Sequence, residues 1–181
     1  MKRVVIVACI ILLAGPPLAS QDAAVEYQVK AAFLYNFAKF VEWPNQVFPS
    51  RESALTICLV GDPFQGAVER TIQGELWNGR PLAVRRIDSA SDVRGCHVVY
   101  VSRAAAQKNM EILMAAASAP ILTVGETDDF IRAGGIIRFT EAGRRIRFEI
   151  NPDAADRVSL RVSSRLLRLA DIVRAPQRAG R

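Results

Sequence analysis

The sequence predicts an α/β fold: a single-domain three-layer sandwich with helices on both faces of a mixed, mostly parallel sheet and a C-terminal hairpin. Strand-like apolar segments alternate with helix-like segments through the middle of the chain, which is typical of βαβ units. Hydrophobic residues make up 50% of the 181 residues, which is enough for one buried core and argues against disorder. A hairpin pattern near the C-terminus adds antiparallel strands, so we expect a mixed sheet.

Residues 1–20 have the pattern of a secretory signal peptide. Lys2 and Arg3 precede an apolar run, which a Gly-Pro-Pro break and small residues end. The run is too short to cross about 30 Å of hydrocarbon comfortably. We therefore expect cleavage at the end of this segment, an exported domain at 21–174 and a polar tail at 175–181. A retained N-terminal anchor, which would make the protein a membrane-tethered accessory subunit, is the alternative.

The first helix pattern covers residues 25–41 and contains the aromatic-rich stretch "AAFLYNFAKFVEWP". Its apolar positions recur at steps of three and four residues, which predicts an amphipathic helix ending before Pro44. The polar positions carry charges of both signs, whereas a nucleic-acid platform would place arginine and lysine between the rings. We interpret the aromatics as core residues, with a partner-binding groove as the alternative and no nucleic acid as partner. The stripe consists of Val25, Val29, Phe33, Phe37, Phe40 and Val41.

The middle of the chain alternates between the two kinds of element. The apolar run at 54–62 predicts a strand that is buried on both faces, as in a parallel sheet. Glycine and proline positions and β-branched runs set the remaining boundaries. Further strands are predicted at 80–87, near a sheet edge because of Pro81, and at 96–102 and 120–126; helices are predicted at 64–73 and 104–118.

Three further elements are predicted after residue 126. Residues 128–133 form one or two helical turns, which Gly134 and Gly135 end. Residues 136–151 form a hairpin with its turn at 141–143. The chain is then helical from Asp153, with an apolar stripe at Val162, Leu166, Leu169 and Val173.

The sequence offers little for catalysis. "VGDPFQG" follows a strand as a phosphate loop would, but the Walker lysine is missing, so we interpret it as a plain turn. His97 is the only histidine, no Gly-x-Ser-x-Gly motif is present, and no CxxC favours a metal. We therefore expect no enzyme activity, cofactor or metal. A small-ligand sensor is the alternative, with a cleft near Glu126 and Phe130 at a strand end.

Cys58 and Cys96 are the two cysteines outside the signal peptide. In an oxidising compartment they are a candidate disulfide, which would stabilise the fold by roughly 4 kcal/mol on the chain-entropy model. Two separate buried thiols are the alternative reading.

Arginines cluster on two of the predicted C-terminal elements. Arg144, Arg145 and Arg147 decorate the hairpin, and further arginines follow at helical spacing. They fit either solvated faces or a surface that docks on a protein or on lipid headgroups. We expect the hairpin arginines, with neighbouring exposed apolar residues, to bind a protein partner, because cations near an apolar rim suit docking.

An ordered set of motifs between residues 26 and 173 resembles the YfiR-like family, also called DUF4154. The matching segments are "EYQVKAAFLYNFAKFVEWP", "LTICLVGDPF", "CHVVYVS", "ILTVGE", "FIRAGGIIRF", "RFEIN" and "SSRLLRLADIV". The resemblance implies a periplasmic α/β domain without a known catalytic site. Cys58 and Cys96 match the disulfide of the family at large, whereas a second cysteine pair of some members is absent here.

The resemblance also implies a regulatory function. Its best-known members look like negative regulators that bind the periplasmic part of an inner-membrane diguanylate cyclase and thereby lower cyclic-di-GMP and biofilm formation. An outer-membrane lipoprotein can sequester them. The resemblance leaves open a homodimer and another membrane partner, whereas the missing second cysteine pair argues against a redox-switching role carried by that pair.

Overall fold

An eight-stranded sheet forms the middle layer of the computed structural model, which describes residues 18–143 and 145–174. Its strand order is β10-β8-β7-β6-β5-β2-β4-β3. Strands β7, β6, β5, β2 and β4 run parallel, whereas the β7–β8 and β3–β4 pairs are antiparallel. The strands are β2 (Leu55–Val60), β3 (Leu76–Trp77), β4 (Arg80–Arg86), β5 (Val98–Val101), β6 (Leu122–Gly125), β7 (Ile137–Ala142), β8 (Arg145–Ile150) and β10 (Asp171–Ile172).

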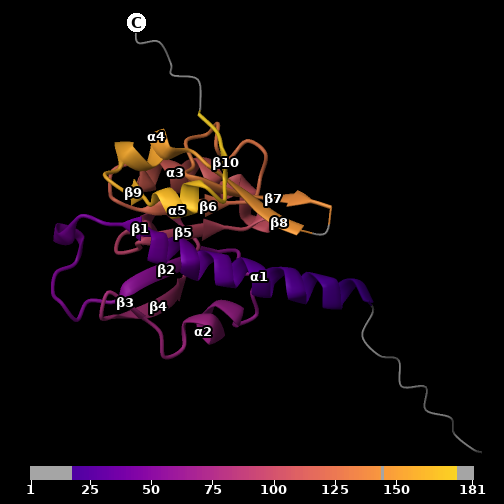
Figure 1. The fold of residues 1–181 in the computed structure, drawn as a ribbon, viewed down its shortest axis with the longest axis horizontal. Helices are drawn as coiled ribbons and strands as arrows, with labels where there is room; N and C mark the ends of the chain where they lie inside the picture. Colours follow the sequence, from indigo (N-terminus) through magenta and orange to yellow (C-terminus); the bar gives the residue numbers. More distant parts are fainter. Residues whose placement is uncertain (1–17, 144, 175–181) are drawn as a thin grey trace, which may run out of the picture.

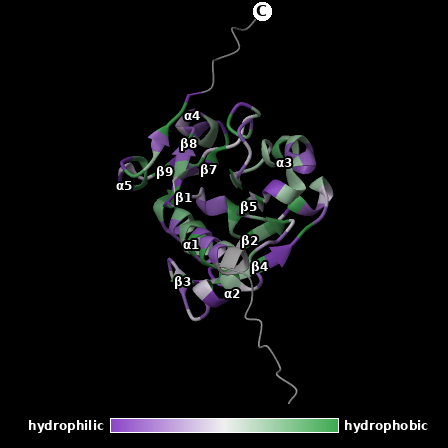
Figure 2. Cartoon of the chain, turned by 90° about the vertical axis from the view of Figure 1, so that its right-hand side faces the viewer, coloured by the Kyte–Doolittle hydropathy of each residue, from purple (hydrophilic) through white to green (hydrophobic). Residues whose placement is uncertain are grey.

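Helices cover both faces of this sheet, which confirms the predicted sandwich. Figure 1 shows α1 running along one face, and Figure 2 shows apolar strands between α1 and α2 on one side and α3 on the other. The helices are α1 (Leu18–Phe40), α2 (Ala67–Ile72), α3 (Asn109–Ala116), α4 (Pro152–Arg157) and α5 (Ser164–Leu167), with 3-10 segments at Asn45–Val47, Ala90–Val93 and Arg103–Lys108. Among the described residues, no helix combines the length and apolar character needed to cross a membrane.

The core has two parts, one on each face of the sheet, and strand β2 contributes to both. Leu55, Ile57 and Leu59 pack toward α1, whereas Cys58 and Val60 pack toward α3. Alternate side chains of a strand point to opposite faces, so a strand covered on both sides must be apolar throughout. This confirms the prediction drawn from the apolar run.

The C-terminal region differs from the single long helix that the sequence predicts. The Asn151 side chain accepts a hydrogen bond from the amide of Ala154 and begins α4, and Ser159 then takes a positive φ of 60° that ends it. The chain forms the short strand β9 (Arg161–Val162), which pairs with β1 (Val41–Glu42). Strand pairing and two turns therefore override the helical spacing of the apolar residues.

Two smaller predictions also need correction. Residues 128–133 form a series of turns rather than a helix, and the hairpin strand β7 continues through Ala142, so the reversal comes later than expected. Strand β4 does lie near the edge of the sheet, where only the two-residue strand β3 lies outside it. Two-residue strands have no detectable period, so the sequence pattern gives no signal for them.

Candidate partner-binding surface

The N-terminal half of α1 exposes an apolar flank. Val25 is 58% exposed and Val29 is 40% exposed, although both belong to the predicted core stripe. Residues four apart lie on one side of a helix, so these two side chains continue the line of Phe33. Phe33 is only partly buried and lies 5.4 Å, ring centre to ring centre, from Phe148. The stripe thus begins in solvent and enters the core only toward the middle of the helix.

The β7–β8 hairpin extends beyond its neighbours in the sheet. Strand β6 pairs with β7 only as far as the Gly125–Arg138 pair, and β10 pairs with β8 only at Glu149 and Ile150. The distal part of the hairpin therefore stands out as a two-stranded ribbon beside the N-terminal half of α1 (Figure 1). One face of this ribbon carries the aromatic residues that contact α1.

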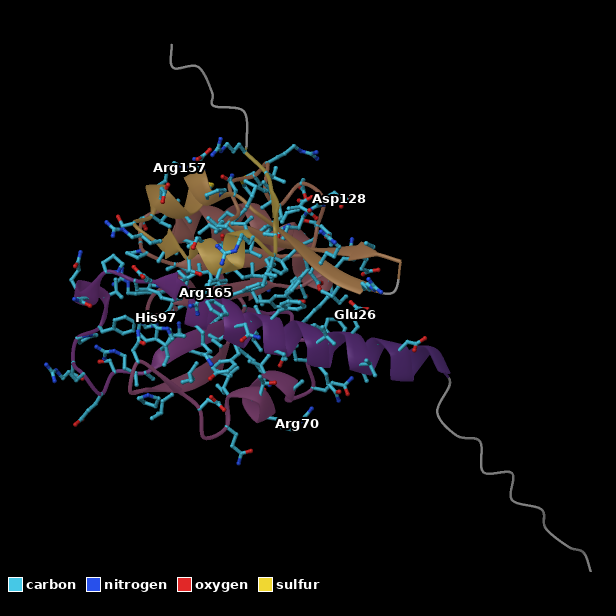
Figure 3. All side chains as sticks on the ribbon, viewed as in Figure 1. Glu26, Arg70, His97, Asp128, Arg157 and Arg165 are labelled. Carbon is cyan, nitrogen blue, oxygen red and sulfur yellow. A yellow bond between two sulfur atoms is a disulfide. The ribbon has the colours of Figure 1, made fainter. Side chains whose placement is uncertain are left out.

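A groove of about 590 Å³ separates the exposed flank of α1 from the hairpin. Its floor is apolar and its rim carries charges of both signs, a composition common in protein-binding surfaces. Figure 3 places Glu26 on the part of α1 that lies below the hairpin. We call this groove and its lining the α1–hairpin groove; it is lined by Asp22, Val25, Glu26, Val29, Phe33, Glu141, Gly143, Arg145 and Ile146.

A buried ion-pair network anchors α1 where its exposed half meets its buried half. Lys30 is almost fully buried and donates hydrogen bonds to Glu126, which follows β6, and to Glu26 one turn earlier on α1. Burial lowers the pKa of Lys30, but the hydrogen bonds to these two carboxylates more than offset this and leave the pKa above its ordinary value. The amide of Arg103 donates to the other Glu126 oxygen at 2.8 Å. The network fixes the helix above the carboxyl ends of β5 and β6.

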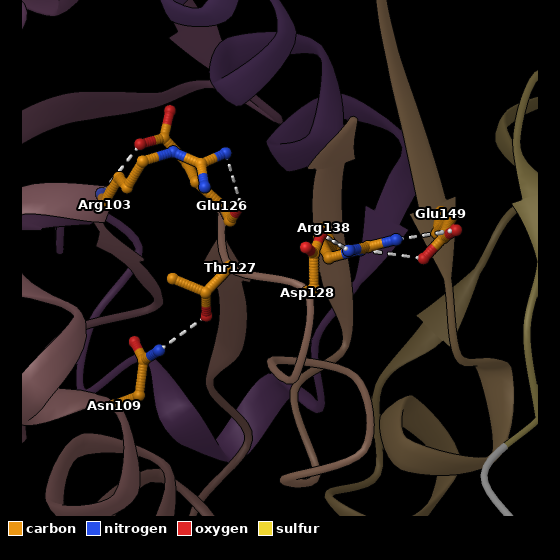
Figure 4. A network of polar contacts seen from close by, with 7 residues as sticks. All are labelled: Arg103, Asn109, Glu126, Thr127, Asp128, Arg138 and Glu149. Carbon is orange, nitrogen blue, oxygen red and sulfur yellow. Dashed lines mark hydrogen bonds and ion pairs between the residues drawn. The ribbon is translucent and has the colours of Figure 1, made fainter. Parts of the chain in front are cut away.

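A second set of ion pairs supports the base of the hairpin. The guanidinium of Arg138 on β7 donates to both carboxylate oxygens of Glu149 on β8, at 2.9 and 3.0 Å, and also reaches Asp128 (Figure 4). Nearby, a neutral hydrogen bond holds the loop after β6, since Asn109 of α3 donates to the hydroxyl of Thr127 at 2.8 Å. Hydrogen bonds to Glu149 raise the pKa of Arg138 further above its ordinary value, so this pairing is charge-assisted.

The structure separates the three hairpin arginines that the sequence suggests as partner-binding residues. Arg145 borders the α1–hairpin groove and has no ion-pair partner among the described residues. Arg147 is half-exposed and donates to both carboxylate oxygens of Asp171 on β10, at 3.1 and 3.2 Å. Arg144 lies outside the described residues.

The two residues suggested for a ligand cleft do not line one together. Glu126 borders a small polar pocket of about 340 Å³, where it is already bonded to Lys30 and Arg103. Phe130 is fully buried and packs between Gly125 and Gly135, where an added Cβ would lie within 2.3 Å and 2.2 Å of its ring. Phe130 is therefore a core residue, and its ring is not available to a ligand in this structure.

Cys58 and Cys96 form the predicted disulfide, with the two sulfurs 1.99 Å apart. It joins β2 to Cys96, two residues before β5, on the α3 side of the sheet and away from the α1–hairpin groove. His97 lies next to it in the chain. Its Nδ1 accepts the amide hydrogen of Thr56 at 3.1 Å, and its ring stacks on Phe48. The imidazole is therefore buried and held by packing and by this hydrogen bond.

Sequence reasoning missed the apolar residues that line the groove. The spacing of Val25 and Val29 matches the buried stripe, so the pattern alone could not show that nothing covers them. Ile146 alternates with arginines on β8, which marks an amphipathic strand but not the surface that its apolar face meets. Lys30 is the one residue that could have pointed to the buried ion-pair network, since a lysine between core positions of a helix needs a buried acidic partner.

The chain is an α/β domain that presents an apolar groove beside a projecting hairpin. The family model described as "DUF4154: YfiR/HmsC-like" matches residues 27–171, so the chain belongs to the YfiR/HmsC-like family. This family is regulatory rather than catalytic, and it supports a periplasmic regulatory role in general. The disulfide is consistent with an oxidising compartment.

Solved structures with a similar fold include one from a bacterium. The crystal structure of a conserved domain protein from Vibrio cholerae O1 biovar El Tor str. N16961 matches with a TM-score of 0.53 at 14% sequence identity. The match covers 78% of this chain and 59% of that chain. At this identity the similarity shows the fold alone.

Proposed function

We propose that this protein is a non-enzymatic periplasmic regulator that binds and restrains an inner-membrane signalling protein. Its membership in a regulatory family and its disulfide support this location and role. The predicted signal peptide at residues 1–20 supports export, and residues 1–17 of it lie outside the described part of the chain.

The observation that carries the proposal is the apolar flank of α1 beside the hairpin. Valine side chains that remain in solvent next to a groove favour contact with another macromolecule, because burying apolar surface stabilises a complex by about 25 cal/mol per Å². A regulator of this kind needs only differential affinity for two states of its partner. A preference of about 1.4 kcal/mol changes their ratio tenfold.

A diguanylate cyclase is the partner that the family resemblance favours. Restraint of such an enzyme from the periplasm would lower cyclic-di-GMP and reduce biofilm formation. An outer-membrane lipoprotein that competes for the regulator would release the enzyme. Both partners are part of the proposal and follow from the family resemblance.

Affinity purification from solubilised membranes tests the proposal, with Val29→Asp as the docking variant. Met114→Asp is the matched control, since Met114 is a helical, exposed apolar residue on α3. We expect wild type and Met114→Asp to retain one inner-membrane signalling protein, identified by mass spectrometry, and Val29→Asp to lose at least nine-tenths of it. Equal retention by all three proteins would contradict the proposed surface.

Cellular cyclic-di-GMP tests the identity of the partner. Deletion of the regulator should raise cyclic-di-GMP, and Val29→Asp should reproduce the deletion while Met114→Asp restores the wild-type level. Charge reversal at Arg145 should weaken partner capture less than Val29→Asp, since a rim charge contributes less than a buried apolar contact. An unchanged nucleotide level after deletion would exclude a diguanylate cyclase while leaving another membrane partner to be identified by the purification.

A further inference from the structure

In the described part of the chain, the outer edge of β8 has no neighbouring strand along its distal half. Strand β10 pairs with β8 at Glu149 and Ile150, and among the described residues no strand pairs with the outer edge of Arg145–Arg147. Arg145 and Arg147 direct their main-chain groups to β7, whereas those of Ile146 face the outer edge, because Ile150 on the same edge accepts from Val173 and main-chain groups alternate along a strand. Among the described segments, none donates a hydrogen bond to the main chain of Ile146 from outside the hairpin. An uncovered strand edge presents a row of main-chain donors and acceptors, which an extended segment can pair with.

This edge borders the apolar groove. On α1, Val25, Val29 and Phe33 lie on the flank that faces the groove, and Ile146 of β8 forms the opposite wall. A strand added beside β8 would send every second side chain toward α1, because side chains alternate along a strand. The groove would accept those side chains, and they should therefore be apolar.

The charges on β8 favour acidic residues at the alternate positions. Arg145 and Arg147 occupy the positions on either side of Ile146, and Arg145 has no ion-pair partner among the described residues. An added strand would place its remaining side chains beside these arginines, where opposite charges across strands stabilise pairing. Pairing with the same edge of a second copy, centred on Ile146, would set Arg145 opposite Arg147, and like charges in that position destabilise the pair.

We infer that β8 binds an extended segment of alternating apolar and acidic residues by strand addition, with the apolar side chains in the α1–hairpin groove. This inference rests on the proposed function, because the segment would belong to the regulated partner. Main-chain hydrogen bonds supply part of the affinity in this mode, and side-chain pockets supply the selectivity.

Hydrogen exchange of the full mature chain with a synthetic peptide tests the inference. The probe is a capped heptapeptide of alternating valine and glutamate. At saturation we expect the amide hydrogen of Ile146, which faces the open edge, to exchange at least tenfold more slowly, whereas those of Arg145 and Arg147 already pair with β7. N-methylation of alternate peptide nitrogens, which removes donors from one edge only, should weaken binding at least tenfold for one of the two methylation patterns. Equal affinity of both methylated peptides and the parent would overturn strand addition.

Two variants test whether the charge of Arg145 selects the residues of the bound peptide. Arg145→Glu should reverse the preference from the valine–glutamate peptide to a valine–lysine peptide, whereas Arg51→Glu, in an exposed loop before β2, should leave it unchanged. Protection of the Ile146 amide that rises with protein concentration in the absence of peptide would assign the edge to a second copy and overturn the inference. Tighter binding of a helix-stabilised peptide with the same composition would also overturn the inference.

These outcomes are distinguishable from failure of the proposed function. The peptide experiments need no membrane protein, and partner capture needs no peptide. Capture that depends on Val29 while the β8 amides remain unprotected in the complex would retain the regulator and overturn strand addition.

Discussion

The two halves of α1 have the same apolar spacing and opposite surroundings. In the C-terminal half, Phe37 is fully buried and packs on Phe139 and Phe148 of the hairpin. In the N-terminal half, Val25 and Val29 continue the same stripe beside an open groove. Helical periodicity identifies the side of a helix that avoids water, but it does not say whether the same chain or another molecule covers that side. We propose that a partner covers the exposed half.

The largest expected contrast comes from truncating one apolar side chain in each half. Phe37→Ala should lower the free energy of unfolding by about 4 kcal/mol, because it opens a cavity in a packed aromatic cluster. Val29→Ala should change it by less than about 0.5 kcal/mol, since the valine is already in solvent. Urea denaturation of both variants measures the difference. Similar losses in the two variants would show that the N-terminal half is packed in solution.

Breaking the ion pair between Lys30 and Glu126, which lies where the two halves of α1 meet, should have the next largest effect on stability. Lys30→Met leaves the buried Glu126 carboxylate without its cation, which should cost about 3 kcal/mol of stability. The double variant Lys30→Met with Glu126→Gln should recover most of this loss, because no buried charge then remains unpaired. The coupling energy from this double-mutant cycle is read from denaturation curves. Additive losses would mean that the two side chains do not depend on each other.

Acidification should lower the stability of the protein through buried His97, which lies away from the α1–hairpin groove. Burial, together with the nearby Arg80, lowers the pKa of His97 below its ordinary value of about 6.5. The unfolded chain therefore takes up the proton first, and stability falls as pH drops below about 6.5, by at most about 1.4 kcal/mol at about pH 5.5. Denaturation at about pH 7.5 and about pH 5.5 measures this. The variant His97→Gln should lose this part of the pH dependence, and an unchanged slope would assign it to other groups.

The smallest expected effect on the free protein is that of Val25→Ser. Its stability should stay within about 0.5 kcal/mol of wild type, because the side chain is more than half exposed. Capture of the membrane partner should nevertheless fall severalfold. Thermal unfolding and quantitative capture on the same preparation separate the two quantities. A variant that loses stability and capture together would remove the distinction between the two halves.

The order of the main elements could be predicted from the sequence. Runs such as Leu55–Val60 combine β-branched residues with burial on both faces, and each is long enough to show its period. The C-terminal region could not be predicted, because the stripe through Val162 and Leu166 has helical spacing while Val162 pairs with Val41 of a distant segment. Pairing between distant short segments depends on the assembled sheet and leaves no local pattern.

The candidate site was predicted only in outline. Hairpin arginines beside an apolar rim could be read from the chain, and Arg145 does lie at the groove. The apolar part of the site was assigned to the core, because exposure depends on where β6 and β10 end. Phe130 was expected at a cleft because it follows a strand end, but the adjacent glycines leave room for its ring inside the core.

Site-specific photo-crosslinking in living cells tests the central claim most directly. A photo-reactive amino acid would replace Val29 in one strain and Met114 in a second, since both side chains are exposed and apolar but lie on opposite faces of the sheet. We predict a crosslink from position 29 to one inner-membrane signalling protein and none from position 114. Crosslinks to the same protein from position 114 but not from position 29 would contradict the account.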